Sequence, residues 1–342
     1  MSVAVLTEAE QKRELALAAA DGSLVTARPA DVRWLLCGRG APVDASAPSS
    51  PYTVLLDGEV VRVLYPDIEH SRVLAEERFD ELGYDLAPYP WHEGPGLEET
   101  EPVLDLLRLD LQEPERERYR LAGADVAEAM RRTVLGLDPE VTELDAAAEL
   151  AYVTRRGGFT TPVVLVAGDE RQRLHRHPLP TSAALGRHAL LAITAERSGL
   201  HVSMTRLVSF GPPDDGLERL VRACAEVDAA YLEASQPGTT VGDVFAEGAR
   251  AYAQHGFPEE WRGHHQGGLI GYRGREVFAV PGQSTVLPTS CAVAWNPSIT
   301  GGAKSEDTAL VSELGIEVVT RTPELGEIET GRGLPRPAIV VL

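Results

Sequence analysis

Histidine is the residue type in this sequence that most clearly indicates chemistry. An imidazole titrates near neutral pH, so it can move protons or bind a metal ion. Of nine histidines, seven lie between residues 175 and 265: His175, His177, His188, His201, His255, His264 and His265. This clustering indicates a site. His188, His201 and His255 have no motif around them, and a surface or packing role fits each of these three.

Three segments combine ionisable side chains with glycine or proline. They are His175–Thr181, Gly263–Glu276 and Trp295–Thr308. Glycine lets a backbone approach a ligand closely and proline fixes loop geometry, so such loops often carry site residues. The structural alternative is a set of tight turns, which use the same residue types.

Proton transfer is the chemistry that these side chains suit best. We expect His177 to act as general acid and base, with His264 sharing the proton work and Glu306 fixing a histidine tautomer. The guanidinium of arginine can donate two parallel hydrogen bonds to the two oxygens of a carboxylate. The expected substrate-binding side chains are His175, His265, Gln266, Tyr272, Arg275, Asn296, Ser203 and Arg206.

A nucleophilic mechanism has little support in the sequence. Ser203 is not in a Gly-x-Ser-x-Gly elbow, and Cys291 lies in an apolar run that predicts a buried, inert thiol. The expected site is polar without being strongly anionic. It therefore suits a neutral or anionic ligand better than a cation.

Composition narrows the classes of partner. The 342 residues include 52 acidic and 32 basic side chains, a net charge of −20. Such a surface repels phosphate backbones and anionic lipids, so we expect no nucleic acid or membrane partner. The first 21 residues lack the pattern of a signal peptide. No run reaches the roughly 18 apolar residues that a membrane-spanning helix needs. The three cysteines have no CxxC spacing of the kind that a zinc site or a redox pair uses. These features predict a cytoplasmic protein.

The helices and strands expected around these loops divide into two predicted domains. Residues 1–112 read as a small α/β domain: a helix over 1–21, an apolar segment at 32–37, a hairpin of 52–56 and 60–65 around Asp57–Gly58, and helical spacing over 68–82. A stretch rich in proline and glycine, 87–101, reads as a connector.

Residues 113–342 read as an α+β domain with an antiparallel bias. Helices are expected over 113–135 and over 143–155, where Thr142 and Asp145 suggest a capping box, and again over 216–234 and 241–255. Strands are expected at 161–167, 189–195, 201–210, 277–280, 291–295, 307–312 and 316–320.

The ordered motifs over residues 118–322 resemble the creatinase, aminopeptidase P and methionine aminopeptidase superfamily. The resemblance rests on seven features in order along the chain. They are the paired helices, a Gly-Phe turn at 158–159, His177 followed by Pro-x-Pro-Thr, a Gly-x-x-x-x-x-x-Arg strand at 199–206, Pro-Gly-Thr-Thr at 237–240, Gly-His-x-x-Gly at 263–267 and Glu-Asp-Thr at 306–308. The resemblance implies a pita-bread fold for the second domain. It also implies a creatinase-like amino-terminal domain and a homodimer.

The same resemblance implies where a dinuclear metal centre would be bound. Peptidases of the superfamily use Asp, Asp, His, Glu and Glu, and the matching positions are Ala192, Ser203, His264, Asn296 and Glu306. Three of these five positions have lost their ligand. A pair of divalent ions needs several anionic oxygens, so we expect no dinuclear metal centre and no cofactor.

Creatinase offers a metal-free precedent within the resemblance, because it hydrolyses a C–N bond with a substrate-loop histidine. Gly263-His-x-x-Gly followed by Tyr272-Arg-Gly-Arg-Glu276 is similar to its own His loop, where arginine binds the substrate carboxylate. Asn296 replaces a glutamate that would hold a cation, so creatine is not the expected substrate.

The leading hypothesis is therefore a metal-independent hydrolase of a C–N bond, or a related proton-transfer enzyme, acting on a small carboxylate-bearing substrate or short peptide. One alternative is a non-catalytic peptide- or protein-binding member of the superfamily. Another is a metal-dependent Xaa-Pro aminopeptidase or prolidase, which the lost ligands oppose.

Overall fold

A computed structural model describes residues 3–342, with side chains from residue 6 onward. The chain separates into two compact units. Unit 1 comprises the described residues up to Arg118 with the loops Ser198–Leu200 and Gly271–Arg273, and unit 2 comprises the rest. Among the described helices, none is both long and apolar enough to cross a bilayer.

The units divide inside helix α4 (Glu113–Leu135), not before it at residue 112. The cause is the charge pairing of its first turns. Within unit 1, Lys12 Nζ donates to Glu115 Oε1 at 2.8 Å, and the Arg118 guanidinium donates to both oxygens of Glu8 at 2.6 and 2.9 Å. These buried pairs bind the start of the helix to unit 1.

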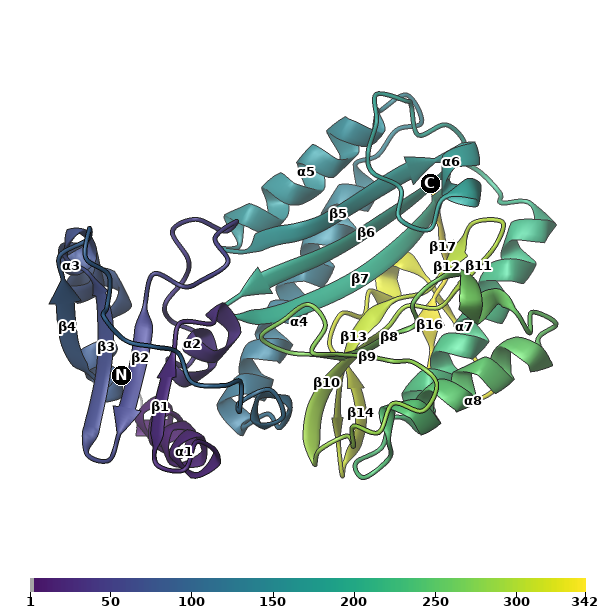
Figure 1. The fold of residues 1–342 in the computed structure, drawn as a ribbon. Helices are drawn as coiled ribbons and strands as arrows, with labels where there is room; N and C mark the ends of the chain where they lie inside the picture. The colour runs from purple at the N-terminus through teal and green to yellow at the C-terminus, as the bar shows by residue number, and fades with distance from the viewer. Residues whose placement is uncertain (1–2) are drawn as a thin grey trace. The chain divides into compact units, whose positions relative to one another are not determined.

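Unit 1 is built on a four-stranded sheet in the order β1-β2-β3-β4 (Figure 1). The predicted hairpin is confirmed, with Asp57 paired to Val60 across the turn. The predicted first helix is confirmed from residue 3 onward; residues 1–2 lie outside the described part. The elements are α1 Val3–Ala19, β1 Ser23–Thr26, α2 Pro29–Leu35, β2 Thr53–Asp57, β3 Val60–Pro66, η1 Asp67–Glu69, α3 His70–Arg72, η2 Val73–Glu77, η3 Phe79–Leu82, β4 Asp85–Tyr89 and η4 Leu107–Leu109.

Two parts of unit 1 differ from the sequence expectation. The region 68–82, expected as one helix, is a series of short 3-10, α and π turns interrupted at Arg78, whose φ is +50°. A left-handed residue ends a helical hydrogen-bond ladder. The proposed connector also contains a strand, because β4 pairs in parallel with β3.

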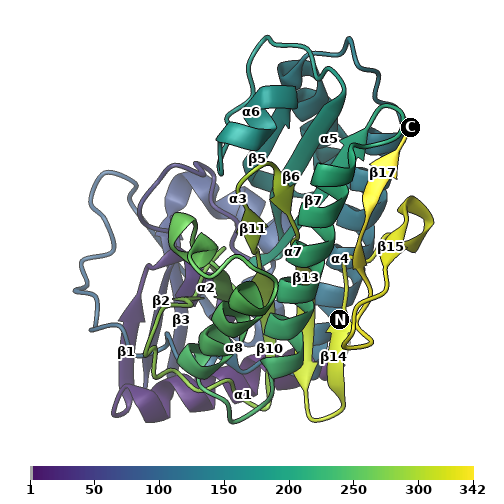
Figure 2. The same cartoon turned by 90° about the vertical axis from the view of Figure 1, so that its right-hand side faces the viewer.

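Unit 2 contains the four helices that the periodicity predicted: the remainder of α4, α5 Glu143–Arg156, α7 Asp215–Ala234 and α8 Val241–Gln254. It also contains three short helices that were not predicted, α6 Asp169–Leu174, η5 Glu260–Gly263 and η6 Pro323–Leu325. Thr142 caps α5 by accepting from the Asp145 amide at 3.1 Å. Helices α7 and α8 run side by side (Figure 2), and Gly248 permits this because a Cβ there would meet the Tyr231 ring at 2.0 Å.

Two larger sheets complete unit 2, with the strand orders β17-β7-β6-β5 and β14-β13-β10-β8-β9. An isolated antiparallel bridge between Thr205 and Glu306 joins the first sheet to the segment just before β13. The strands are β5 Thr160–Gly168, β6 His188–Arg197, β7 Leu200–Ser209, β8 Gly267–Ile270, β9 Val277–Phe278, β10 Ser290–Trp295, β11 Ser298–Ile299, β12 Ala303–Lys304, β13 Asp307–Ser312, β14 Gly315–Val318, β15 Glu327–Ile328, β16 Arg336–Pro337 and β17 Ile339–Val341.

Candidate functional site

A cavity of about 540 Å³ lies in unit 2, and its walls differ in polarity. One wall is apolar and comes largely from β5 and β6. The other is rich in ionisable groups from the loops that the sequence singled out. The apolar lining is Pro162, Val163, Val164, Leu165, Leu179, Ala192, Ile193 and Phe278; the polar lining is His177, Thr194, His201, His265, Arg275, Asn296, Lys304 and Glu306.

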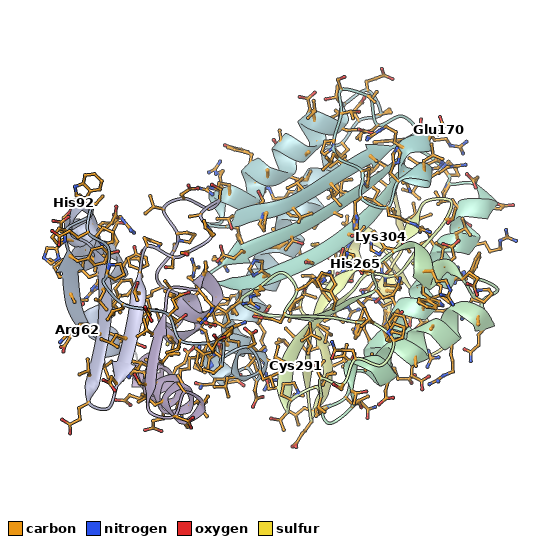
Figure 3. The ribbon with its side chains drawn as sticks, in the orientation of Figure 1. Arg62, His92, Glu170, His265, Cys291 and Lys304 are labelled. Carbon is orange, nitrogen blue, oxygen red and sulfur yellow. The ribbon has the colours of Figure 1, made fainter. Side chains whose placement is uncertain are left out.

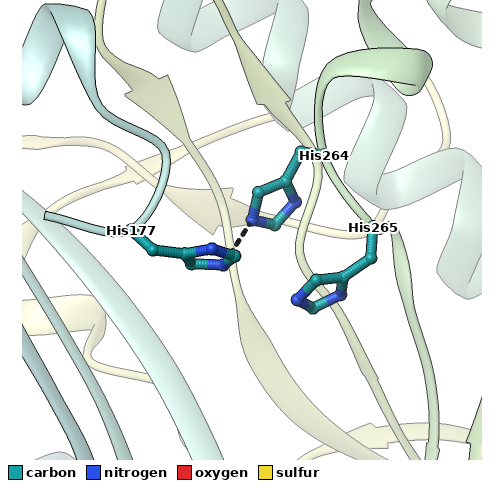
Figure 4. A group of neighbouring side chains, drawn as sticks. All are labelled: His177, His264 and His265. Atoms are coloured by element: carbon teal, nitrogen blue, oxygen red, sulfur yellow. Dashed lines mark hydrogen bonds between the residues drawn. The ribbon is translucent and has the colours of Figure 1, made fainter.

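Three histidines cluster at the polar wall (Figure 4), which His177 and His265 line and which His264 contacts through His177. The Nε2 atoms of His177 and His264 are 2.9 Å apart in a hydrogen bond. His265 stacks on His264 with ring centroids 4.5 Å apart and an interplanar angle of 22°. The cluster therefore joins the 175–181 loop to the start of the segment that leads into β8.

Loss of hydration and nearby positive charges favour the uncharged form of these imidazoles at neutral pH. Burial, followed by the positive charge of Lys304, lowers the pKa of His177 and lowers that of His264 strongly. Burial and the charge of Arg275 lower the pKa of His265 to about 4. Neutral imidazoles can accept a proton from a substrate or from water.

A single carboxylate faces two cationic side chains beside the histidines. Arg275 Nη2 donates to Glu306 Oε1 at 3.1 Å, and Lys304 Nζ lies 4.0 Å from Glu306 Oε2. Thr205 Oγ1 also donates to Glu306 Oε2, at 2.9 Å. Two cations against one carboxylate leave this wall net positive, which favours an anionic group on a ligand.

Several buried polar atoms at the site have no hydrogen-bond partner in the described protein. They include Nδ1 of His264, Nδ1 of His265, Nε of Arg275 and Oδ1 of Asn296. Buried polar groups are nearly always paired, so a concentration of unpaired atoms around one cavity is typical of a binding site. This observation is independent of the motif spacing.

Both ends of the His177 loop are fixed, one by a half-buried ion pair and the other by hydrogen bonds to a buried carboxylate. At one end, Arg176 donates to Ser298 Oγ at 2.9 Å and Thr300 Oγ1 at 2.8 Å, and it pairs with Glu260. At the other end, the buried Glu143 accepts from the amide and hydroxyl of Thr181 at 2.8 and 2.7 Å. The imidazole of His177 is thus carried on a constrained loop.

The backbone around His264 is fixed by a different set of contacts. Gln266 is buried and donates to the His264 carbonyl at 2.6 Å, while its own oxygen accepts from Tyr252 at 3.0 Å. Gly267 (φ +91°) and Gly268 (φ +140°) follow, and a Cβ on either would meet a carbonyl oxygen at 2.1 Å. The glycines are therefore required for β8 to lie this close to its neighbours.

The structure brings together some of the expected site residues and separates others. His177, His265, Arg275, Asn296 and Glu306 line the cavity, and His264 contacts it through His177. The other five expected residues do not line this cavity.

Ser203, Arg206, Gln266 and Tyr272 are buried in networks within the protein. Arg206 pairs with Asp307 Oδ1 at 3.0 Å and donates to the Thr320 carbonyl at 2.8 Å, so it has no donor directed at a ligand. Tyr272 belongs to unit 1, where its hydroxyl donates to Glu115 at 2.8 Å. His175 is exposed and borders a separate, smaller crevice.

Sequence reasoning missed Lys304, His201, Thr194 and the apolar wall. A signal for Lys304 was available, because lysine accounts for only two of the 32 basic residues. Figure 3 labels Lys304 and His265, which both lie in unit 2 and line the same cavity. No local motif marks the others.

The residues present do not suit the dinuclear metal centre that the resemblance implies. Of the five ligand positions, Ala192 and Ser203 offer no carboxylate, Asn296 offers only a neutral amide, and the Lys304 ammonium lies beside Glu306. Two dications require several anionic oxygens. The nitrogens of His177, His264 and His265, all within 4.8 Å of one another, could hold one transition-metal ion.

Comparisons with known proteins agree with the fold. The model of metallopeptidase family M24 matches residues 117–313. A probable dipeptidase PepE of Mycobacterium tuberculosis is 27% identical over 230 residues, covering 65% of this chain and 61% of that protein. An agropine synthesis cyclase of Rhizobium rhizogenes is 33% identical over 116 residues, covering 32% of this chain and 28% of that protein.

A Xaa-Pro dipeptidase of Pyrococcus furiosus is 24% identical over 207 residues, covering 56% of this chain and 58% of that protein. Thus the match spans about three fifths of the length of these dipeptidases. Among solved structures, dipeptidase PepE from Mycobacterium ulcerans has a TM-score of 0.74 at 18% identity, covering 98% of this chain and 99% of that one. The expected pita-bread fold is confirmed.

Proposed function

Since the chain belongs to metallopeptidase family M24, we propose that it is a hydrolase of a C–N bond in a small carboxylate-bearing substrate, with histidines in place of a dinuclear metal centre. The observation that carries this proposal is the neutral His177–His264 pair at the wall of a net positive cavity. The peptidase names of the relatives support a hydrolase at the level of the family.

The two walls of the cavity define the substrate class. Arg275 presents a planar guanidinium that suits a carboxylate, and its Nε has no partner within the protein. The apolar lining of Val163, Leu165 and Ile193 suits an aliphatic or acyl group. An N-acyl amino acid or a dipeptide has both features and fits a cavity of about 540 Å³.

His177 is the general acid and base in this proposal. It is the exposed member of the histidine pair, so its free face is open to a water molecule and a substrate. The neutral ring accepts a proton as water attacks the carbonyl carbon, and the resulting imidazolium returns the proton to the leaving nitrogen. His264 holds the ring of His177 through the hydrogen bond between their Nε2 atoms.

A metal-dependent dipeptidase is the second candidate. The dipeptidase and Xaa-Pro dipeptidase relatives favour it, and so does the clustering of three histidine nitrogens within 4.8 Å. Against it, Lys304 and Arg275 place two positive charges close to this cluster, and both lower the pKa of His265 after burial does. The same charges repel a divalent cation.

A substrate panel tests the proposal. Purified protein is incubated with N-acyl amino acids, Xaa-Pro dipeptides and guanidino acids, and products are identified by mass spectrometry. Loss of water is scored as well as hydrolysis, because one relative is named a cyclase. We expect cleavage of an N-acyl amino acid or dipeptide.

A pair of variants provides the control. His177→Ala should lose activity by about 10²- to 10⁴-fold while keeping its melting temperature, since an exposed side chain contributes little to stability. His255→Ala, an exposed histidine at the end of α8, should keep full activity. Equal activity in the two variants, or no product from any panel member, contradicts the proposal.

A further inference from the structure

Lysine is almost absent from this chain, and both lysines are buried. Only Lys12 and Lys304 occur among the 32 basic residues, so arginine makes nearly all the surface ion pairs. A buried ammonium is costly because its hydration is lost, and it is normally compensated by several partners. The two lysines differ in this respect.

Lys12, in unit 1, has a full set of partners. Its ammonium donates to Glu8 Oε1 at 2.7 Å, Glu115 Oε1 at 2.8 Å and the Tyr272 hydroxyl at 3.2 Å. These three acceptors match the three N–H groups of an ammonium. These partners account for the burial of Lys12, whose role is therefore to stabilise unit 1.

Lys304, in unit 2, is not compensated in this way. Its side chain is 4% exposed, and among the described residues its one ion pair is the 4.0 Å approach to Glu306. That carboxylate already accepts from Arg275 and Thr205. The ammonium lines the cavity instead of closing a structural network.

The backbone on either side of Lys304 is fixed. In the β11–β12 hairpin Lys304 pairs with Ser298, and the next residue, Ser305, donates its amide to the Pro297 carbonyl at 3.1 Å. On the preceding side, Gln172 donates to the Gly302 carbonyl at 2.9 Å. A fixed backbone and a buried stem give the ammonium a defined position at the cavity wall.

We propose that Lys304 is a catalytic residue whose ammonium stabilises the negative charge that develops on the substrate carbonyl oxygen. This inference rests on the proposed function, because it assigns a role within the same reaction. It also accounts for the mismatch with a metal centre: a fixed positive charge on the protein performs the electrostatic task of a bound cation.

The step balances without any further reactant. Water adds its oxygen to the carbonyl carbon, and the C=O π pair moves onto the oxygen, which becomes an oxyanion facing Lys304. One proton of the water passes to the imidazole of His177. The oxyanion pair then re-forms the C=O bond, the C–N bond breaks with its electron pair on nitrogen, and the imidazolium protonates that nitrogen.

Arg275 and Lys304 have separable roles in this account. A planar guanidinium suits the two oxygens of a substrate carboxylate, whereas a compact ammonium suits a single oxygen. Stabilisation of an oxyanion acts only in the transition state, so removal of Lys304 should lower kcat with little change in KM. Loss of a carboxylate anchor would raise KM instead.

Kinetics of three variants on a panel substrate test the role. Lys304→Met should lower kcat by about 10²- to 10³-fold with KM nearly unchanged. Lys304→Arg should recover part of the loss. Arg250→Met, which removes an exposed charge from α8, should match the parent protein. An unchanged kcat in Lys304→Met, or a change confined to KM, overturns the inference while the proposed function stands.

Folding is checked in the same preparations. Lys304→Met should melt at the same temperature as the parent or higher, because Glu306 keeps Arg275 and a poorly compensated buried charge is removed. Lys12→Met should melt lower, because it leaves Glu8 and Glu115 without their shared cation. A lower melting temperature in Lys304→Met with kcat intact assigns Lys304 to structure and overturns the inference.

Nitrogen NMR gives a readout that does not need turnover. Protein labelled with 15N-lysine carries only two side-chain ammonium groups. Methylphosphonate, a small tetrahedral anion, should shift the Lys304 signal and leave that of Lys12 in place. No turnover of any panel substrate overturns the proposed function and the inference together. Turnover accompanied by methylphosphonate binding that leaves the Lys304 signal in place, or by no methylphosphonate binding at all, overturns the inference alone.

Discussion

His177 and His264, which are 87 residues apart in the chain, share a hydrogen bond of 2.9 Å between their Nε2 atoms. One ring must donate and the other accept, so the two neutral imidazoles are locked in complementary tautomers. The bond depends on the position of the His177 loop. Contacts that fix that loop are therefore positioning contacts for the proposed reaction.

Arg176 makes the most important of these contacts, because its hydrogen bonds join the His177 loop to the β11–β12 hairpin that carries Lys304. Replacing it, as Arg176→Met, removes the bonds to Ser298 and Thr300. We expect kcat to fall by about 10- to 100-fold, since misplacement of a catalytic group by about 1 Å has that effect. The measurement is kcat together with hydrogen exchange of residues 174–181.

Faster amide exchange in that loop should accompany the loss of kcat. Arg173→Met is the matched control, because Arg173 is exposed and pairs with Asp214 away from the cavity. A slower enzyme with unchanged exchange in residues 174–181 would contradict a positioning role for Arg176.

The long elements of unit 2 were predictable because their periodicity is strong. Helix α4 was predicted with the bounds that the structure has, and the Thr142 cap was predicted from the residue type alone. The region 68–82 was not, because helical spacing does not reveal where a residue such as Arg78 adopts a positive φ.

The site was predictable in part for a physical reason. Histidine, arginine and glutamate in glycine-rich loops marked the segments, but the same residue types also satisfy buried networks, as Gln266 and Arg206 do. Only tertiary packing separates the two cases. Lys304 lies in the segment Trp295–Thr308, but no motif assigns it a role, and its importance rests on having so few partners. Homodimer formation stays a prediction.

A buried ion-pair network around Arg336 should be a major source of the stability of unit 2. Arg336 is 1% exposed and pairs with Asp228 at 2.7 Å and with Asp307 at 2.6 Å. Arg336→Met leaves two buried carboxylates without this cation, which costs about 3–5 kcal/mol of unfolding free energy. Urea unfolding measures the change. A loss below about 1 kcal/mol, the worth of an exposed pair, would show that the network is not a major source of stability.

Acid should weaken unit 1 through Glu8. Burial alone would raise the pKa of Glu8, but the hydrogen bonds and charges of Arg118 and Lys12 lower it to about 2, from 4.5 in an unfolded chain. A lowered pKa in the folded state adds stability above pH 4.5, and this is lost as pH falls towards 2. The contribution is of the order of 3 kcal/mol at neutral pH.

Urea unfolding of the parent and Glu8→Gln at several pH values measures this pH-dependent contribution of Glu8 to the unfolding free energy. The advantage of the parent should be full near pH 6 and should shrink steadily below pH 4.5. An advantage that does not change with pH would mean that the charge of Glu8 contributes nothing.

Restoring the missing ligands should create a metal centre. Ala192→Asp, Ser203→Asp and Asn296→Glu, combined with Lys304→Ala, supply carboxylates at the three positions and remove the competing ammonium. We expect this variant to bind a pair of Mn²⁺ ions in calorimetry and the parent to bind no pair. Tight binding of two Mn²⁺ ions by the parent would contradict the donor-set argument.

We propose that this member of a metallopeptidase family acts without a dinuclear metal centre. The most direct measurement is turnover of a panel substrate by protein dialysed against a chelator, with metal content determined by mass spectrometry on the same sample. Turnover should be unchanged at a metal content far below one ion per chain. Turnover that the chelator abolishes and Mn²⁺, Co²⁺ or Zn²⁺ restores would contradict it and establish the metal-dependent alternative.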